Sequence, residues 1–307
     1  MPSATRIPST TEVSSDAGSF DEASNEPTNN GPSHGISTPD PGLQPGSAKL
    51  SLNGIAQLNV EGLKTSASSS VSFVRDTLEE HNLLFIMLTE TWLRDHVDAE
   101  LAIPNYVLHR QDRSRLKKRR GRNSGGVAVY VRSDIAVETV FNYSSDVIDA
   151  ICLNFIGLNL IACLVYRQPD DPVGGHRSTA AEFSTFVDKL NEELASLPTP
   201  TPNIILGGDF NLPHASWPSG ESTQGASPDE RRMLQVLSNL STQHFLVQVT
   251  DQPTHRAGNI LDLLFTNCPD NFISVQSTPT EPISSHNLVR YTTLISSETG
   301  PIERHYR

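Results

Sequence analysis

The sequence predicts an α+β fold in the form of a four-layered α/β sandwich, with two packed mixed β-sheets flanked by helices. Nine short segments rich in branched aliphatic residues are typical of strands, whereas three segments carry the periodicity of an amphipathic helix. A Rossmann fold or a TIM barrel would need a helix after nearly every strand. Two sheets packed face to face, with helices on their outer faces, fit this ratio of strands to helices.

The nine predicted strands are short, and several of them end directly in a polar residue. They cover Ile55–Val60, Leu83–Thr89, Val127–Val131, Ala150–Phe155, Leu158–Tyr166, Ile204–Leu206, Phe245–Val249, Ile260–Thr266 and Leu288–Ile295. Their branched aliphatic side chains suit a pleated and largely buried surface.

Two of the three predicted helices also have a start signal. Thr179 and Glu182 have the spacing of a capping box, and Ser227 is placed as an N-cap before Pro228 and Glu230. Apolar stripes at helical spacing follow both signals and also define the first helix, and we assign all of them to the core. They comprise Val71, Val74 and Leu78; Phe183, Phe186, Leu190, Leu194 and Leu197; and Met233, Leu237 and Leu240.

The chain of 307 residues divides by composition into three parts. Residues 1–46 consist almost entirely of Ser, Thr, Pro, Gly, Asn and acidic residues, which cannot bury enough apolar surface to offset chain entropy. We therefore expect a disordered tail there, a folded domain over residues 47–296, and a short C-terminal tail over residues 297–307. The domain is long enough for a packed core.

The formal net charge of −12 argues weakly against a nucleic-acid partner until the distribution of charge is considered. Eight basic residues lie between Arg110 and Arg122, with Asp112 as the single acid among them. One strongly basic loop on an acidic body can hold a phosphate backbone. A solvated loop is the commoner role of such a run, and Lys117–Arg120 also has the composition of a nuclear import signal.

The three cysteines, Cys152, Cys163 and Cys268, lie in apolar segments and are odd in number. We expect them to be reduced core residues, as in a cytosolic or nuclear protein. The sequence has no CxxC pair or HExxH motif that would indicate structural zinc, no apolar signal segment at its start, and no apolar run of bilayer length. We therefore expect an intracellular protein that is not secreted and has no membrane partner.

The segment Ile204–Asn211 carries the clearest chemical signal. It runs from an apolar stretch through Gly207 and Gly208 to Asp209 and Asn211. In an extended chain, residues two apart point to the same side, so this acid and this amide can face one reacting group. The glycines allow a sharp bend and a close approach of the backbone. A carboxylate beside a carboxamide suits a magnesium-bound phosphate, which indicates a metal-assisted phosphodiesterase.

Other polar residues stand at the ends of predicted strands, and each has an ordinary explanation when taken alone. A carboxylate after a strand is usually a turn residue or a helix cap, a tyrosine is usually packing, and a histidine is usually structural. Asp262 is different, because a charge among aliphatic and aromatic neighbours costs several kcal/mol unless it has a partner such as a histidine. The set comprises Asn59, Glu61, Glu90, Tyr166, Asp262 and His286.

Taken in chain order over about residues 50–296, these pieces resemble the endonuclease/exonuclease/phosphatase superfamily, which has the DNase I-like fold. Several segments are most similar to the endonuclease domain of non-LTR retrotransposons, a branch that normally continues into a reverse transcriptase. We therefore expect the chain to be a fragment or a domesticated piece of such an element. These segments are Gly125–Tyr130 after the basic run, Tyr166–Pro169, Gly208–His214, and Pro253–Arg256 running into Leu261–Leu263.

The resemblance implies a role for each site residue. Glu90 is the main Mg²⁺ ligand, assisted by Asn59 and Glu61, with Mn²⁺ as a substitute ion. Asp209 and Asn211 orient the attacking water and the scissile phosphate, and Tyr166 hydrogen-bonds a phosphate oxygen. Asp262 holds His286, which acts as an acid/base or as a cationic donor. Whether Asp209 or His286 takes the proton from water stays open. The DNA backbone is expected to contact Arg113, Arg115, Lys117, Lys118, Arg119, Arg120 and Arg122.

The chain departs from the family pattern at Ser285. The usual ending is Ser-Asp-His, but this chain has Ser284-Ser285-His286, so the acid that normally helps bind metal is missing. A neutral hydroxyl cannot replace that charge. The leading hypothesis is a magnesium-dependent endonuclease that nicks duplex DNA for target-primed reverse transcription, weakened at Ser285. Two alternatives remain: an inactive nucleic-acid-binding relic of a retroelement, and a phosphoesterase acting on a lipid or a small molecule.

Overall fold

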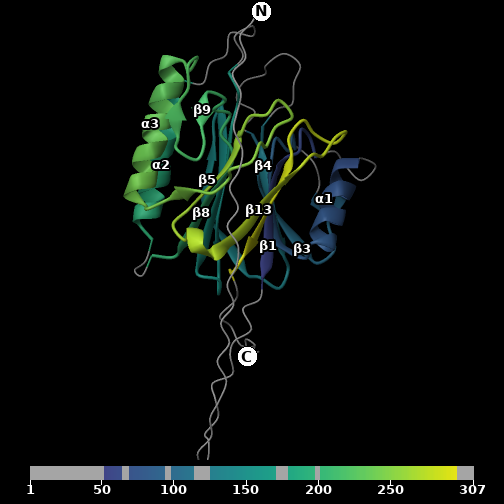
Figure 1. Cartoon of the computed structure of the whole chain (residues 1–307). Coiled ribbons are helices and arrows are strands. Elements are labelled where there is room, and N and C mark those ends of the chain that lie inside the picture. The colour runs from purple at the N-terminus through teal and green to yellow at the C-terminus, as the bar shows by residue number, and fades with distance from the viewer. Residues whose placement is uncertain are drawn as a thin grey trace, which may run out of the picture. The chain divides into compact units, whose positions relative to one another are not determined.

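The computed structural model describes residues 52–63, 69–93, 98–113, 125–170, 179–197 and 201–295. In these residues the chain forms two six-stranded mixed sheets and three α-helices, which confirms the predicted fold class (Figure 1). The two expected tails, residues 1–46 and 297–307, lie outside the described residues. So do the basic residues from Arg115 to Arg122. No described helix is both long and apolar enough to cross a membrane.

One sheet, here called sheet A, has the strand order β13-β14-β1-β2-β4-β3. The pair β1–β2 is parallel, and every other neighbouring pair in this sheet is antiparallel. Its strands are β1 (Asn53–Asn59), β2 (Leu83–Thr89), β3 (Tyr106–Gln111), β4 (Val127–Arg132), β13 (Phe272–Thr278) and β14 (Leu288–Thr293).

The other sheet, sheet B, has the order β11-β12-β8-β7-β6-β5, with β7–β8 as its parallel pair. Two-residue strands β9 (Ala215–Ser216) and β10 (Glu221–Ser222) form a separate small ladder. The strands of sheet B are β5 (Val137–Ser144), β6 (Ile148–Phe155), β7 (Leu160–Arg167), β8 (Asn203–Asp209), β11 (Val247–Gln248) and β12 (Asp262–Thr266).

The three helices are α1 (Ser69–Glu80), α2 (Ala180–Ala195) and α3 (Pro228–Gln243), and short 3₁₀ turns lie at Asp98–Leu101 and Pro269–Asn271. The capping box of α2 is confirmed, since Thr179 and Glu182 hydrogen-bond each other's backbone. Ser227 caps α3 as predicted. However, the Glu230 carboxylate accepts hydrogen bonds from the backbone and ring of His214.

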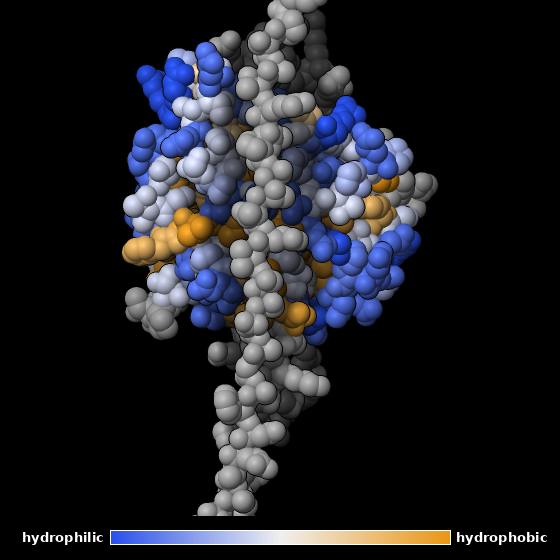
Figure 2. Space-filling view, viewed as in Figure 1, coloured by the Kyte–Doolittle hydropathy of each residue, from blue (hydrophilic) through white to orange (hydrophobic). Residues whose placement is uncertain are grey.

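Apolar side chains fill three interfaces between four layers. Helix α1 covers one face of sheet A, while α2 and α3 cover one face of sheet B, and the remaining faces pack together. Ile55 and Ala56 show the alternation, because Ile55 belongs to the core between the sheets and Ala56 to the core under α1. The face drawn in Figure 2 is mainly hydrophilic, with scattered apolar patches, as expected when the main apolar surfaces are internal.

The cysteine prediction is wrong for two of the three residues. Cys152 and Cys163 are direct partners in the antiparallel pair β6–β7, with Cα atoms 4.0 Å apart, and the structure joins them in a disulfide. Close, directly opposed positions of two strands bring such side chains into contact. Cys268 is free. The expectation of a reducing compartment, which rested on three thiols, therefore loses that support.

Candidate active site

The predicted site residues converge where strands of both sheets end. In sheet B, Asp209 is the direct neighbour of Tyr166 on one side and of Asp262 on the other. In sheet A, Asn59 ends β1 beside the end of β2. The amide of Asn59 donates to Asp209 Oδ2 over 2.8 Å and to Glu90 Oε1 over 3.2 Å. One side chain therefore joins the acids of the two sheets.

A left-handed backbone turn immediately follows several of these strands. Glu61, Glu90 and Asn211 have φ angles of 46°, 52° and 49°. Such conformations cost about 1–3 kcal/mol each in a non-glycine residue and concentrate at functional sites. Gly208 has φ 130°, and a Cβ there would lie 1.9 Å from the carbonyl oxygen of Val165. Gly208 thus lies against the backbone of the neighbouring strand β7, and the predicted close approach of this glycine backbone to a ligand stays a prediction.

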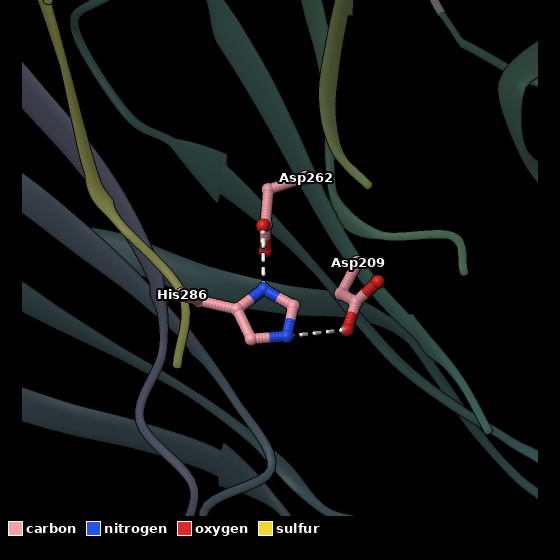
Figure 3. Close-up of side chains that lie close together, drawn as sticks. All are labelled: Asp209, Asp262 and His286. Carbon is pink, nitrogen blue, oxygen red and sulfur yellow. Dashed lines mark hydrogen bonds and ion pairs between the residues drawn. The ribbon is translucent and has the colours of Figure 1, made fainter. Parts of the chain in front are cut away.

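Figure 3 shows Asp262, His286 and Asp209 in a row. The Nδ1 of His286 lies 2.8 Å from Asp262 Oδ2, and its Nε2 lies 3.9 Å from Asp209 Oδ2. All three side chains are buried. The hydroxyl of Thr254 accepts the backbone N–H groups of Leu261 and Asp262, which fixes the start of β12. The predicted partnership of Asp262 with a histidine is present.

The charges of this group shift two pKa values upward. Burial lowers the pKa of His286, but the charge and hydrogen bond of Asp262, followed by the charges of Asp209 and Glu90, outweigh it and raise that pKa well above its ordinary value. Burial, followed by the charge of Asp262, raises the pKa of Asp209 toward neutrality despite the opposing effect of His286. The geometry thus favours a cationic imidazole beside a carboxylate able to accept a proton near neutral pH.

Glu90 is held by three side chains. Trp92 Nε1 donates to Glu90 Oε2 over 3.0 Å, Asn59 donates to Oε1, and the hydroxyl of Tyr166 hydrogen-bonds the same carboxylate. Tyr166 is 1% exposed. Its burial, followed by the charges of Glu90 and Asp209, raises the pKa of Tyr166 well above the ordinary value. Tyr166 therefore contributes a neutral hydroxyl that contacts Glu90, and its expected hydrogen bond to a phosphate oxygen stays a prediction.

Asn211 is tied to the backbone around it. Its N–H donates to Asp209 Oδ1 over 3.0 Å, and its side-chain amide donates to the carbonyl of Arg167 over 2.7 Å. Arg167, which is fully buried, donates in return to the carbonyls of Phe210 and Asn211. This reciprocal clamp fixes the turn after β8 and thereby the direction of Asp209.

Ser285 contacts Glu61 twice. The backbone N–H of Ser285 donates to Glu61 Oε2 over 3.1 Å, and its hydroxyl donates to Oε1 over 2.6 Å. The neighbouring Ser284 donates to the carbonyl of Asn59 over 2.6 Å, which ties the His286 segment to the end of β1. The residue that breaks the family pattern thus holds one of the predicted metal ligands.

The oxygen donors around Glu90 fit a divalent cation. Glu61 and Glu90 keep part of their surface exposed, and with the amide oxygen of Asn59 they are the hard ligands that Mg²⁺ prefers. Asp209, Asp262 and His286 also place one possible ligand atom each within 4.8 Å of one another.

Several contributing residues were not predicted from the sequence. Trp92, Thr254, Ser284 and Arg167 touch the predicted residues or their backbone but had no assigned role. His255 was also missed: its ring lies 4.9 Å from that of His286, edge to face, in a backbone bridge between the two residues. The available signal was proximity in sequence, because Trp92, Arg167 and Ser284 stand within two residues of a predicted one.

Comparison with known proteins agrees with this fold. The sequence profile of the Endonuclease/Exonuclease/phosphatase family matches residues 56–281, which is more than half of the chain. The chain therefore belongs to this family. Its members are hydrolytic nucleases or phosphatases and generally use divalent metals, and the buried group of Asp209, Asp262 and His286 has ligand atoms close enough together to hold such an ion. No curated protein sequence matches the chain.

Solved structures with the same fold include nucleic-acid enzymes. The endonuclease domain of TRAS1, a telomere-specific non-LTR retrotransposon, superposes with a TM-score of 0.50 at 13% identity, covering 80% of this chain and 99% of that one. The AP endonuclease LMAP from Leishmania major gives 0.55 at 15% identity, with 79% and 87% covered. An AP endonuclease from Archaeoglobus fulgidus gives 0.54 at 15%, with 78% and 99% covered. At these identities the similarity establishes the DNase I-like fold.

Proposed function

We propose that this protein is a magnesium-dependent endonuclease that nicks one strand of duplex DNA and leaves a 3′-hydroxyl from which reverse transcription is primed. The observation that carries this proposal is the hydrogen-bonded bridge of Asn59 between Glu90 and Asp209, beside the pair formed by Asp262 and His286. It supports the proposal because carboxylate and amide oxygens, a buried carboxylate and an imidazole lie together in one hydrogen-bonded group. The similarity to a retrotransposon endonuclease domain supports the choice of substrate.

Glu90 would hold Mg²⁺ with the help of Asn59 and Glu61, and Mn²⁺ would be accepted in its place. The ion would supply polarisation of the phosphate and stabilisation of the leaving oxyanion. Asp209, whose pKa is raised toward neutrality, accepts the proton of the attacking water. The protonated ring of His286 donates to a phosphate oxygen, where negative charge increases in the transition state.

Asn211 and Tyr166 then serve mainly to position other groups. Asn211 sets the direction of the Asp209 carboxylate through its backbone, and Tyr166 orients Glu90 with its neutral hydroxyl. The basic segment Arg115–Arg122 would contribute the phosphate-backbone contacts. Such contacts supply affinity and register, and they carry no sequence information by themselves.

A second candidate is a nucleic-acid-binding relic without catalytic activity. The observation that favours it is Ser285, whose hydroxyl occupies the position of the usual acid and binds Glu61. Losing one preorganised catalytic group commonly lowers rates about a hundredfold or more. The chain would then retain the fold and the basic segment but fail to cut.

Nicking of supercoiled plasmid in the presence of Mg²⁺ separates the two candidates. The proposal expects relaxed circles whose 3′ ends are extended directly by a polymerase, and loss of nicking in Glu90→Ala and His286→Ala. Arg132→Gln is the matched control, because Arg132 pairs with Asp134 on the surface. Plasmid that is bound but not cut, even at high Mg²⁺ or Mn²⁺, would identify the relic instead.

A further inference from the structure

The guanidinium of Arg113 faces the inside of the domain. Its Nε donates to Asp149 Oδ2 over 2.8 Å, its Nη1 donates to Gln168 Oε1 over 2.8 Å, and its Nη2 lies 2.8 Å from the same Asp149 oxygen. The side chain is 14% exposed. The sequence analysis grouped Arg113 with the phosphate-contacting residues, but its nitrogen atoms are directed to partners within the chain.

Asp149 is the buried partner of this arginine and is itself held by further hydrogen bonds. Its side chain has no exposed surface, and it accepts two further hydrogen bonds of 2.8 Å, from the N–H of Gly126 and the hydroxyl of Ser144. Gly125 leaves room for the pair, since a Cβ there would lie 2.4 Å from Arg113 Nε and 2.7 Å from Asp149 Oδ2. A buried pair with this many hydrogen bonds has a defined geometry.

Two connections run from this pair to the candidate active site. The Arg113 guanidinium lies over the ring of Tyr166, 5.4 Å from its centroid, and the Tyr166 hydroxyl contacts Glu90. A guanidinium over an aromatic ring at this distance is a favourable cation–π arrangement. In addition, the carbonyls of Gly125 and Gly126 accept the N–H groups of Trp92 and Thr91, the two residues that follow Glu90.

We propose that Arg113 is a positioning residue of the active site, which orients Tyr166 and through it Glu90, and that it does not contact the DNA backbone. This inference rests on the proposed function and adds to it a residue that positions the proposed metal ligand Glu90 through Tyr166. Asp149 binds both Arg113, which precedes the basic segment in the chain, and the N–H of Gly126, which follows it. The residues that flank the basic segment on its two sides therefore lie close together.

The first test measures DNA binding as a function of salt, which needs no catalytic turnover. Each lost phosphate contact lowers the slope of log K against log salt concentration by about 1. We expect the double variant Arg113→Gln/Asp149→Asn to keep the slope of the wild type. Lys118→Gln, a change within the basic segment, serves as the comparison and lowers it by about 1. The double variant removes both charges together, so that no unpaired charge is left buried.

The second test is a double-mutant cycle on nicking rates under single-turnover conditions. Misplacing a positioned group costs up to about a hundredfold in rate, so we expect the chemical rate of Arg113→Lys to fall by roughly tenfold to a hundredfold while the DNA concentration at half-saturation changes less than about twofold. In a Tyr166→Phe background the same change should lower the rate by less than about threefold. A purely structural role would lower the rate equally in both backgrounds.

The outcomes are separable from those for the proposed function. A salt slope lowered by about 1 in the double variant would overturn the inference, and so would additive effects of Arg113→Lys and Tyr166→Phe. A wild-type protein that binds DNA without cutting it would refute the endonuclease proposal. The salt slopes alone would then decide whether Arg113 contacts the backbone. A wild-type protein that neither binds nor cuts DNA would end both proposals.

Discussion

Replacing Ser285 by aspartate restores the acid that the family pattern expects, and the structure predicts an effect that depends on metal. The Ser285 hydroxyl donates to Glu61 Oε1 over 2.6 Å. A carboxylate at this position cannot donate that hydrogen bond, and it would stand beside a second carboxylate. Without a divalent ion, we expect Ser285→Asp to destabilise the protein. With Mg²⁺, the two acids become a better ligand pair, and we expect nicking to rise.

The magnitude follows from the separation of the groups. Two carboxylates about 4 Å apart repel by about 1 kcal/mol in water and about 4 kcal/mol near a protein surface. The lower half of this range applies because Glu61 is partly exposed. The lost hydrogen bond to a charged group adds about 1.5 kcal/mol. The sum of about 2.5–4 kcal/mol corresponds to a fall in Tm of roughly 5–16 °C for a domain of this size.

Thermal unfolding of Ser285→Asp, with EDTA and then with Mg²⁺, measures this directly. The wild type and Ser285→Asn, which introduces a similar volume without charge, are the controls. Because the repulsion requires Glu61, most of the loss should disappear in a Glu61→Gln background. An equal loss in that background, or a loss that Mg²⁺ does not reverse, would refute the reasoning and indicate a steric cause.

Three further predictions concern groups that hold the site. Gly208→Ala should lower the free energy of unfolding by about 3 kcal/mol or more in urea titrations, because its Cβ would overlap the Val165 carbonyl. Arg167→Met should cost about 2–6 kcal/mol in the same titrations, since two buried carbonyls lose their donor at about 1–3 kcal/mol each. His286 has a pKa raised from 6.5 to about 10, so its contribution to stability is complete below pH 6.5 and is lost as the pH rises through 10. The stability advantage of the wild type over Asp262→Asn should therefore shrink over that range, and an advantage that is constant with pH would contradict the assigned charge of the ring.

The sequence predicted the central strands of both sheets but missed three edge strands. Those missed are β3, β5 and β13, each at an edge of its sheet. Edge strands have one unpaired side and, in this fold, mixed exposure along most of their length. Without a continuous apolar run, they carry little of the signal on which strand prediction depends. Central strands β2 and β7 are buried along their whole length and were found easily.

The sequence pointed to polar residues that the structure brings together, whereas it could not predict their contacts. Strand-end position singled out Glu90, Asp209 and His286 because polar groups next to apolar runs are conspicuous in a sequence. The contacts of Arg113 and Ser285 depend on which residues far apart in the chain become neighbours, such as Asp149 for Arg113. The Cys152–Cys163 disulfide was missed for the same reason, since it follows from strand register and not from the spacing of cysteines.

The site contains residues from both sheets, and it therefore lies where strand ends of the two sheets meet. Each sheet contains one parallel pair, β1–β2 in sheet A and β7–β8 in sheet B, and most of the site residues lie at or just after the C-terminal ends of these pairs. Ligands bind outside such strand ends in many α/β proteins. Asn59 is a direct contact between the two halves, because it ends a strand of sheet A and donates to Asp209 of sheet B. A change in sheet packing would therefore reach Glu90 and Asp209 through this amide, so the large apolar core between the sheets also determines the geometry of the acids.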